Sequence, residues 1–186
     1  MNSSLKRSSE FAQKAQRLAE QGKLPEARQL CERACRQAPD VSQTWALLGA
    51  IDGRLGRFID AAENYLRAIN LEPTLISAHS GRVSALLAGG IFQEAHAACR
   101  QALQADPKAP VLHCLHGQLL ERTDNVEEAI TSYQRALDLK PNYRESTLRL
   151  GALLVQSGQW HQAAGFYKQA LQFQPADPQL QVGLAS

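Results

Sequence analysis

Small and hydrophobic residues return along the chain at a fixed spacing of 34 residues. In the stretch from Ser42 to Leu75, Trp45 and Leu48 come first, Ala61, Tyr65 and Ala68 follow, and Pro73 comes near the end. Proline is only about 5% of residues in proteins generally, so five prolines at one register are not a chance arrangement. The pattern predicts a chain built of internal repeats. The positions shared by all five copies are Ala27, Ala61, Ala95, Ala129 and Ala163; Ala34, Ala68, Ala102, Ala136 and Ala170; and Pro39, Pro73, Pro107, Pro141 and Pro175.

Each repeat predicts two helices joined by a tight turn. Trp45, Leu48 and Ile51 recur every three residues, as on one side of a helix. Gly56 then ends this first helix, because glycine readily takes the left-handed conformation of a helix C-terminus. Ala61, Tyr65 and Ala68 form the inner stripe of a second helix, which ends before Pro73 because proline disfavours helical geometry in the residue before it. The other copies place Gly22, Gly90, Gly158 and the pair Asp124-Asn125 at the same turn.

Glycines inside the first helices predict close packing. Gly49, Gly117 and Gly151 share one register, although glycine costs about 1 kcal/mol of helix propensity relative to alanine. A contact that excludes a side chain explains their return, with an aromatic residue of the second helix (Tyr65, Tyr133 or Tyr167) filling the adjacent space. Cys31 and Cys99 stand at the tyrosine register, so we interpret them as small core hydrophobes.

Composition and charge narrow the functional classes. The net charge is +2, from 20 basic and 18 acidic side chains. No strong basic stripe is present, so nucleic-acid binding is not predicted. No apolar run reaches the roughly 18 residues that a membrane-spanning helix requires, so membrane insertion is not predicted. The N-terminus has no apolar core of the kind found in secretory signals, and we expect a cytoplasmic protein.

The residues Trp45, Leu48 and Gly49, then Ala61, Tyr65 and Ala68, then Pro73, form a pattern that resembles the tetratricopeptide repeat (TPR). This resemblance implies an all-α fold, a right-handed α-solenoid (superhelix) of antiparallel helix pairs whose first helices line a concave groove. The expected organisation is a flexible N-terminal head at 1–7, repeats at 8–41, 42–75, 76–109, 110–143 and 144–177, and a partial sixth repeat or capping helix at 178–186.

The densest cluster of chemically active side chains is His113, Cys114 and His116, with His79 one repeat earlier. Zinc-binding histidines on a helix are often four residues apart, whereas His113 and His116 are three apart and fill the registers of Trp45 and Leu48. Cys31 and Cys35 have no nearby histidine to complete a zinc site. Nothing in the sequence orients Cys114 as a nucleophile. We therefore predict no metal, no cofactor and no catalytic residues, and interpret the histidines as semi-buried core residues.

In the TPR family, ligand-contacting residues come mainly from the second, fifth, ninth, twelfth and thirteenth places of each repeat. These places hold no lysine or asparagine here, which disfavours the carboxylate clamp that binds chaperone tails, and the sixth places hold no asparagine ladder. They are instead rich in small residues, which leave room for a peptide or helix or, alternatively, only permit tight curvature. The predicted groove residues are Gln43, Ala46, Ala50, Arg54, Ser77, Ser80, Ser84, Cys114, Gln118, Arg122 and Arg149.

Three functional hypotheses follow. The first is a non-catalytic scaffold or adaptor that binds a protein or peptide ligand in the concave groove, where Arg54, Arg122 and Arg149 would meet acidic groups. The second is the N-terminal recruiting domain of a larger bacterial enzyme of the glycosyltransferase or sulfotransferase type, an inference from analogy alone. The third is self-association through the C-terminal end, with Leu180, Val182 and Leu184 exposed.

Overall fold

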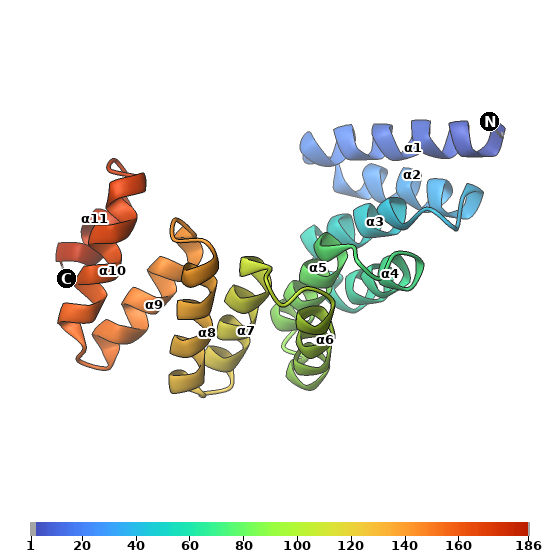
Figure 1. Cartoon of the computed structure of the whole chain (residues 1–186). Helices are drawn as coiled ribbons and strands as arrows, with labels where there is room; N and C mark the ends of the chain where they lie inside the picture. Colours follow the sequence, from blue (N-terminus) through green and yellow to red (C-terminus); the bar gives the residue numbers. More distant parts are fainter. Residues whose placement is uncertain (1–2, 186) are drawn as a thin grey trace. The chain divides into compact units, whose positions relative to one another are not determined.

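A computed structural model describes residues 3–185, which form eleven α-helices and no strand (Figure 1). Odd-numbered helices are the first members of the repeated pairs and even-numbered helices the second members. The bounds are α1 Ser3–Glu20, α2 Leu24–Gln37, α3 Ser42–Arg54, α4 Phe58–Leu71, α5 Ile76–Ala88, α6 Phe92–Ala105, α7 Pro110–Arg122, α8 Val126–Leu139, α9 Arg144–Gln156, α10 Trp160–Phe173 and α11 Pro178–Ala185. The predicted all-α fold of helix pairs is confirmed.

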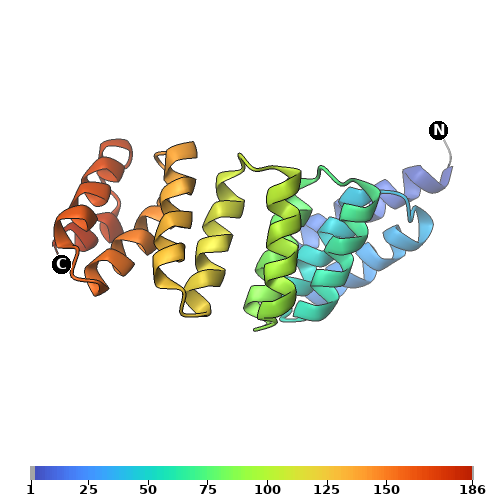
Figure 2. The ribbon, with the colours of Figure 1, turned by 60° about the horizontal axis from the view of Figure 1, so that its bottom comes forward.

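The helices form two compact units, which we describe separately. Unit 1 spans Met1–Ala105 and unit 2 spans Asp106–Ser186. Within each unit, helices that follow one another in the sequence pack side by side and are joined by short turns (Figure 2). In unit 1, α3, the first member of its pair, also contacts α1 and α5, which are the first members of theirs. In unit 2, α9 contacts α11. First helices of neighbouring pairs therefore share a face within each unit.

The turns inside the helix pairs have the predicted conformation. Gly22, Gly56, Gly90 and Gly158 have φ angles between 71° and 79°, in the left-handed region that glycine enters without steric cost. In the fourth pair Asp124 takes this role with φ of 63°. Aspartate tolerates this conformation better than most residues.

The N-terminal residues differ from the expected flexible head. Helix α1 begins at Ser3, so residues 3–7 extend the first helix, and residues 1–2 lie outside the described residues. Two serine hydroxyls tie this extension to α2: Ser4 Oγ donates to the carbonyl of Gln37 at 2.7 Å, and Ser8 Oγ donates to that of Ala34 at 2.9 Å. The helix continues because α2 offers it a partner along its length.

The glycines of the first helices lie against tyrosine rings, as predicted. A Cβ atom placed on Gly49 would be 3.0 Å from Tyr65, and one on Gly117 would be 2.6 Å from Tyr133. A further glycine, in the next repeat, lies against the outer end of the same ring: a Cβ atom on Gly81 would be 2.3 Å from Tyr65 Cζ. Gly151 and Gly183 enclose Tyr167 in the same way.

Where the second helix carries cysteine, its neighbours are larger. Cys31 lies in a core cluster with Ala15, which replaces the glycine, and Leu47 packs against that cluster. Leu47 stands at the register of Gly81. Alanine and leucine thus occupy the space that the smaller cysteine leaves, where the other repeats have two glycines beside a tyrosine. The interpretation of Cys31 as core is confirmed by its full burial.

Two glycine-to-alanine substitutions are expected to have opposite effects. Gly117→Ala should lower the free energy of unfolding by about 1 kcal/mol or more, because overpacking against the fully buried Tyr133 outweighs the gain in helix propensity. Gly165→Ala, on the exposed side of α10 with no atom within 4 Å of the new Cβ, should raise it by up to about 1 kcal/mol. Urea unfolding followed by circular dichroism measures both, and equal stabilisation by the two alanines would contradict the packing argument.

Candidate functional site

The first-helix face of unit 1 is made by α1, α3 and α5 and carries most of the small residues predicted for the groove. Ala50, Ser77 and Ser84 are exposed, and Ala46 and Ser80 are half-buried. The hydroxyl of Ser80 donates to the backbone carbonyl of Ser77 at 3.2 Å. Because these side chains are short, they add little bulk to the surface of α3 and α5.

A cavity of about 280 Å³ lies between α1 and α3 on this face, and its lining carries no charged side chain. Three glutamines supply amide groups that can both donate and accept hydrogen bonds. Gln43 Nε2 donates to Glu72 Oε2 at 2.9 Å and Gln16 Nε2 donates to Glu20 Oε1 at 3.2 Å, whereas Gln13 has no protein partner among residues 3–185. The lining is Leu5, Ser8, Ser9, Ala12, Gln13, Gln16, Val41, Gln43, Thr44 and Leu47.

Arg54 and Arg149, both expected to meet a ligand, have partners in the chain. Arg54 is exposed, but its Nη1 donates to the carbonyl of Ala19 at 2.9 Å and so caps the C-terminal end of α1. Arg149 contacts Glu121 at 3.4 Å and Glu145 at 2.7 Å. Arg122 is exposed on α7. A ligand carboxylate would therefore have to compete with internal carboxylates for Arg149.

In unit 2 these groups form a polar network across the first helices α7 and α9. Tyr133 Oη donates to Glu121 Oε2 at 2.8 Å, and Gln118 Nε2 donates to Glu145 Oε1 at 3.4 Å. Burial, with the hydrogen bond to Glu121, raises the pKa of the Tyr133 phenol well above its ordinary value, so the hydroxyl remains a donor at physiological pH. The predicted residues Gln118 and Arg149 are thus brought together, but by bonds within the unit.

Cys114 does not lie open in a groove as predicted. Its side chain is 1% exposed and belongs to the core cluster of unit 2, against which Tyr143 also packs, while Gln118 Nε2 lies 3.7 Å from its Sγ atom. Burial raises the pKa of the thiol, which opposes formation of the nucleophilic thiolate. The fifth place of this repeat is therefore a core position, and Cys114 is unavailable to a ligand.

His79 and His113 stand at the register of Trp45, and their rings contact the equivalent backbone group to its indole. Trp45 Nε1 donates to the carbonyl of Pro39 at 2.8 Å, and His79 Nε2 and His113 Nε2 lie 2.8 Å from the carbonyls of Pro73 and Pro107. A carbonyl only accepts, so Nε2 carries the proton in both imidazoles. The interpretation as core residues is confirmed for His79, which is 2% exposed.

None of the His, Cys, Asp and Glu side chains in residues 3–185 come together in a group of three or more suited to hold a metal ion. Ser132 Oγ lies 3.0 Å from His116 Nδ1, and Cys31 Sγ donates to the carbonyl of Thr44 at 3.4 Å. These side chains are therefore engaged in bonds between helices.

Unit 1 contains a buried carboxylate that was not predicted from the sequence. Asp52 is 0% exposed, and its Oδ1 atom lies 2.6 Å from Arg28 Nε and 3.5 Å from Arg57 Nε. Asn64 Nδ2 donates to its Oδ2 atom at 2.9 Å. A signal was present in the repeat register, since the other four copies have leucine at the same place: Leu18, Leu86, Leu120 and Leu154.

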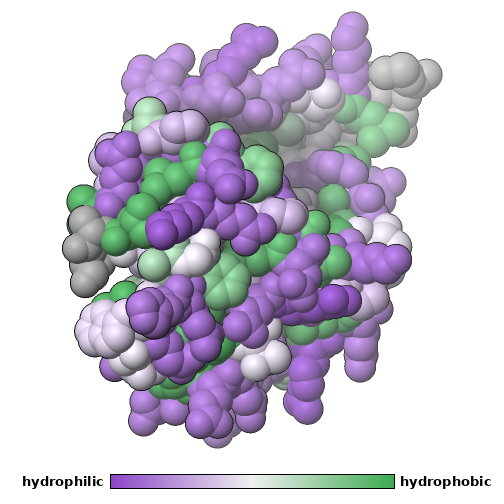
Figure 3. All heavy atoms as spheres, turned by 60° about the vertical axis from the view of Figure 1, so that its left-hand side comes forward, coloured by the Kyte–Doolittle hydropathy of each residue, from purple (hydrophilic) through white to green (hydrophobic). Residues whose placement is uncertain are grey.

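The C-terminal helix is more enclosed than predicted. Leu180 is 1% exposed and Leu184 packs against the core of unit 2, so only Val182, at 69%, fits the expectation of an exposed row. The reason is that α11 docks on α9 and α10, with Gly183 against the ring of Tyr167. Figure 3 shows hydrophobic residues at the surface of this end, bordered by hydrophilic ones. Trp160 and Phe173 of α10 are also exposed, at 57% and 53%.

Across residues 3–185, no helix combines the length and the apolar character needed to cross a membrane.

Comparison with known proteins places these features in a family. The chain is 28% identical over 102 residues to the Hsp70-Hsp90 organizing protein of Triticum aestivum, a match that covers 55% of this chain and 18% of that protein. The chain thus spans less than a fifth of that relative's length.

Two solved structures share the fold. A thermophilic TPR protein of Thermus thermophilus is 22% identical with a TM-score of 0.75, covering 96% of this chain and 97% of that one. YrrB, described as a TPR protein with an unusual peptide-binding site, is 12% identical with a TM-score of 0.66, covering 95% and 91%. At these identities the likeness concerns the fold alone. The model of the Tetratricopeptide repeat family matches residues 47–110 and 114–178, and the chain therefore belongs to the tetratricopeptide repeat family.

Proposed function

We propose that this chain is a non-catalytic scaffold that binds an extended peptide or a helical segment of a partner protein on the first-helix face of unit 1. The observation that carries the proposal is the uncharged cavity between α1 and α3, continued by exposed small residues on α3 and α5. A peptide has one donor and one acceptor per residue, and glutamine amides and serine hydroxyls match both.

The chemistry of this face defines the ligand. Charged side chains are absent from the cavity lining, so the favoured segment is polar or apolar and carries little charge where it contacts α1 and α3. The wheat relative's name refers to organizing two chaperones, and YrrB is described by a peptide-binding site. Both are consistent with binding of protein segments, although this chain lacks the lysines and asparagines of a carboxylate clamp.

Bulky groove substitutions are expected to weaken peptide binding. Peptides selected from a display library on the whole chain should bind Ala50→Arg and Ser80→Arg about tenfold or more weakly, because an arginine on α3 or α5 fills space that the peptide needs. Isothermal titration calorimetry measures the affinities. Ala97→Arg, the same kind of exchange at an exposed site on α6, is the matched control and should bind like the unmodified chain. Undiminished binding to both groove variants would overturn the proposal.

A further inference from the structure

A second cavity, of about 510 Å³, lies between the second helices α2 and α4 of unit 1, with α3 as its floor. Its lining differs from that of the α1–α3 cavity in being both charged and aromatic. The residues are Arg28, Glu32, Cys35, Arg36, Pro39, Trp45, Leu48, Asp60, Glu63, Asn64 and Arg67. A neighbouring cavity of about 230 Å³ shares Pro39, Trp45 and Arg67 and adds Asn70 and Leu71. We call the two together the α2–α4 groove.

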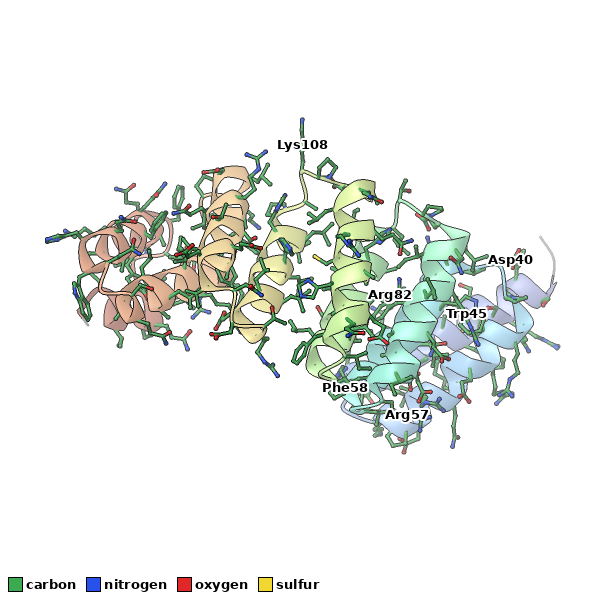
Figure 4. All side chains as sticks on the ribbon, turned by 90° about the horizontal axis from the view of Figure 1, so that it is seen from below. Asp40, Trp45, Arg57, Phe58, Arg82 and Lys108 are labelled. Carbon is green, nitrogen blue, oxygen red and sulfur yellow. The ribbon has the colours of Figure 1, made fainter. Side chains whose placement is uncertain are left out.

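The groove is elongated along two parallel helices. At one end, near the start of α4, Asp52 links Arg28 of α2 to Arg57. At the other end, Pro39 and Leu71 line the smaller cavity. Figure 4 shows Trp45 among these helices, away from the turn that carries Arg57 and Phe58. From Asp60 to Leu71 a helix rises about 16 Å, or three turns. This length suits a segment of polypeptide better than a compact metabolite.

The floor offers an anchor for one large hydrophobic side chain. Trp45 is half-buried, and its orientation is fixed by the bond from its indole nitrogen to Pro39. Leu48 and Cys35 are buried beside it, and Leu71 remains 43% exposed at the end of the groove. A tryptophan ring held in one orientation supplies a large contact area at little entropic cost.

Along both walls of the groove, acidic side chains come first and basic side chains follow one turn later. Glu32 and Glu63 are followed four residues later by Arg36 and Arg67, which places two guanidinium groups about 6 Å further along the groove. Glu63 and Arg67 are spaced to pair with each other. Instead, the guanidinium of Arg67 lies 4.8 Å from the Trp45 ring centroid, and Glu63 has no ion pair among residues 3–185. Arg36 is 74% exposed, and its ion pair with Glu32 is long, at 4.0 Å.

We propose that the α2–α4 groove binds an amphipathic helix of a partner protein. This helix presents one large hydrophobic side chain to Trp45, a basic residue to Glu63 and, one turn further along, an acidic residue to Arg36 and Arg67. The apolar floor supplies affinity, and the order of charges fixes the direction in which the helix lies. Because no residue lines both this groove and the α1–α3 cavity, the two surfaces allow the chain to join two partners.

The probe is an alanine-based helical peptide whose lysine and glutamate are four residues apart, with a leucine three residues after the lysine, so that all three side chains lie on one face. A Trp160→Phe background leaves Trp45 as the sole tryptophan, so its fluorescence reports binding. Saturable binding of this peptide, and its loss when the leucine is replaced by alanine, are expected. Absence of detectable binding would overturn the proposal.

Substitutions in the chain then locate the site. Arg67→Glu should weaken binding about tenfold or more, and a peptide with lysine in place of its glutamate should bind this variant better than the original peptide does. Arg100→Glu, at an exposed site on α6, is the matched control. Equal binding to the Arg67 and Arg100 variants would refute the site. Ala50→Arg should leave binding unchanged, which separates this proposal from peptide binding on the first-helix face.

Discussion

Replacing Tyr133 with alanine is expected to lower the free energy of unfolding by about 3 to 5 kcal/mol, in the range observed for large aromatic core residues. The side chain is 0% exposed and is the largest of the fully buried residues. It fills the space beside Gly117, where no Cβ is present to occupy the resulting cavity. Hydrogen exchange of unit 2 should show the loss at α7, α8 and α9, because repeat proteins unfold locally when one interface is weakened.

Tyr133→Phe separates packing from hydrogen bonding. It keeps the ring and removes only the hydroxyl that donates to Glu121. Its cost should be smaller, about 0.5 to 1.5 kcal/mol, because Glu121 retains Arg149 as a partner and is not left unsatisfied. If alanine and phenylalanine cost the same, the ring is not the main source of stability and the glycine–tyrosine packing argument fails.

The repeat period was sufficient to predict the scaffold, because the fold depends on positions that every copy shares. Gly56 and its equivalents need a left-handed φ, and Tyr65 needs Gly49 beside it, so both requirements are visible as recurring residue types. The exception is residues 3–7, where helix α1 extends beyond the repeat register. Serine is a poor indicator of helix, and the bonds of Ser4 and Ser8 to α2 arise only in the folded chain.

The candidate site was harder to predict because it depends on residues that differ between copies. Register alone placed Cys114 in the groove, yet the local packing of Tyr143 and Gln118 makes it a core residue. It also placed Arg54 in the groove but did not predict that Arg54 Nη1 caps the end of α1. Long side chains reach across helices to whichever partner is nearest, and their register does not specify that partner.

The buried Asp52 departs from the leucine register of the other four copies. It bonds Arg28 of α2 and Asn64 of α4, and both of these residues also line the α2–α4 groove. Leucine cannot accept these hydrogen bonds, so the leucine-containing repeats cannot form the same polar connection between their second helices.

Asp52→Ala is expected to lower the free energy of unfolding by about 2 to 3 kcal/mol. Removing one member of a buried ion pair typically costs about 3 to 5 kcal/mol, because the remaining charge is left uncompensated. The lower value applies here because the partner side chains are partly in contact with water, with Arg28 24% exposed and Arg57 49% exposed. Asn64 would also lose the acceptor for its buried amide.

Asp60→Ala is the matched control for this prediction, since Asp60 also pairs with Arg57, at 2.7 Å, but is 43% exposed. An exposed pair contributes little, so this variant should change the free energy of unfolding by no more than about 0.5 to 1 kcal/mol. Urea unfolding of both variants, with hydrogen exchange to localise the change to α2, α3 and α4, measures the difference. Equal effects of the two substitutions would show that burial of Asp52 adds nothing to its pairing. A large effect confined to Asp52→Ala would instead show that the buried carboxylate stabilises α2, α3 and α4 through its bonds to Arg28 and Asn64.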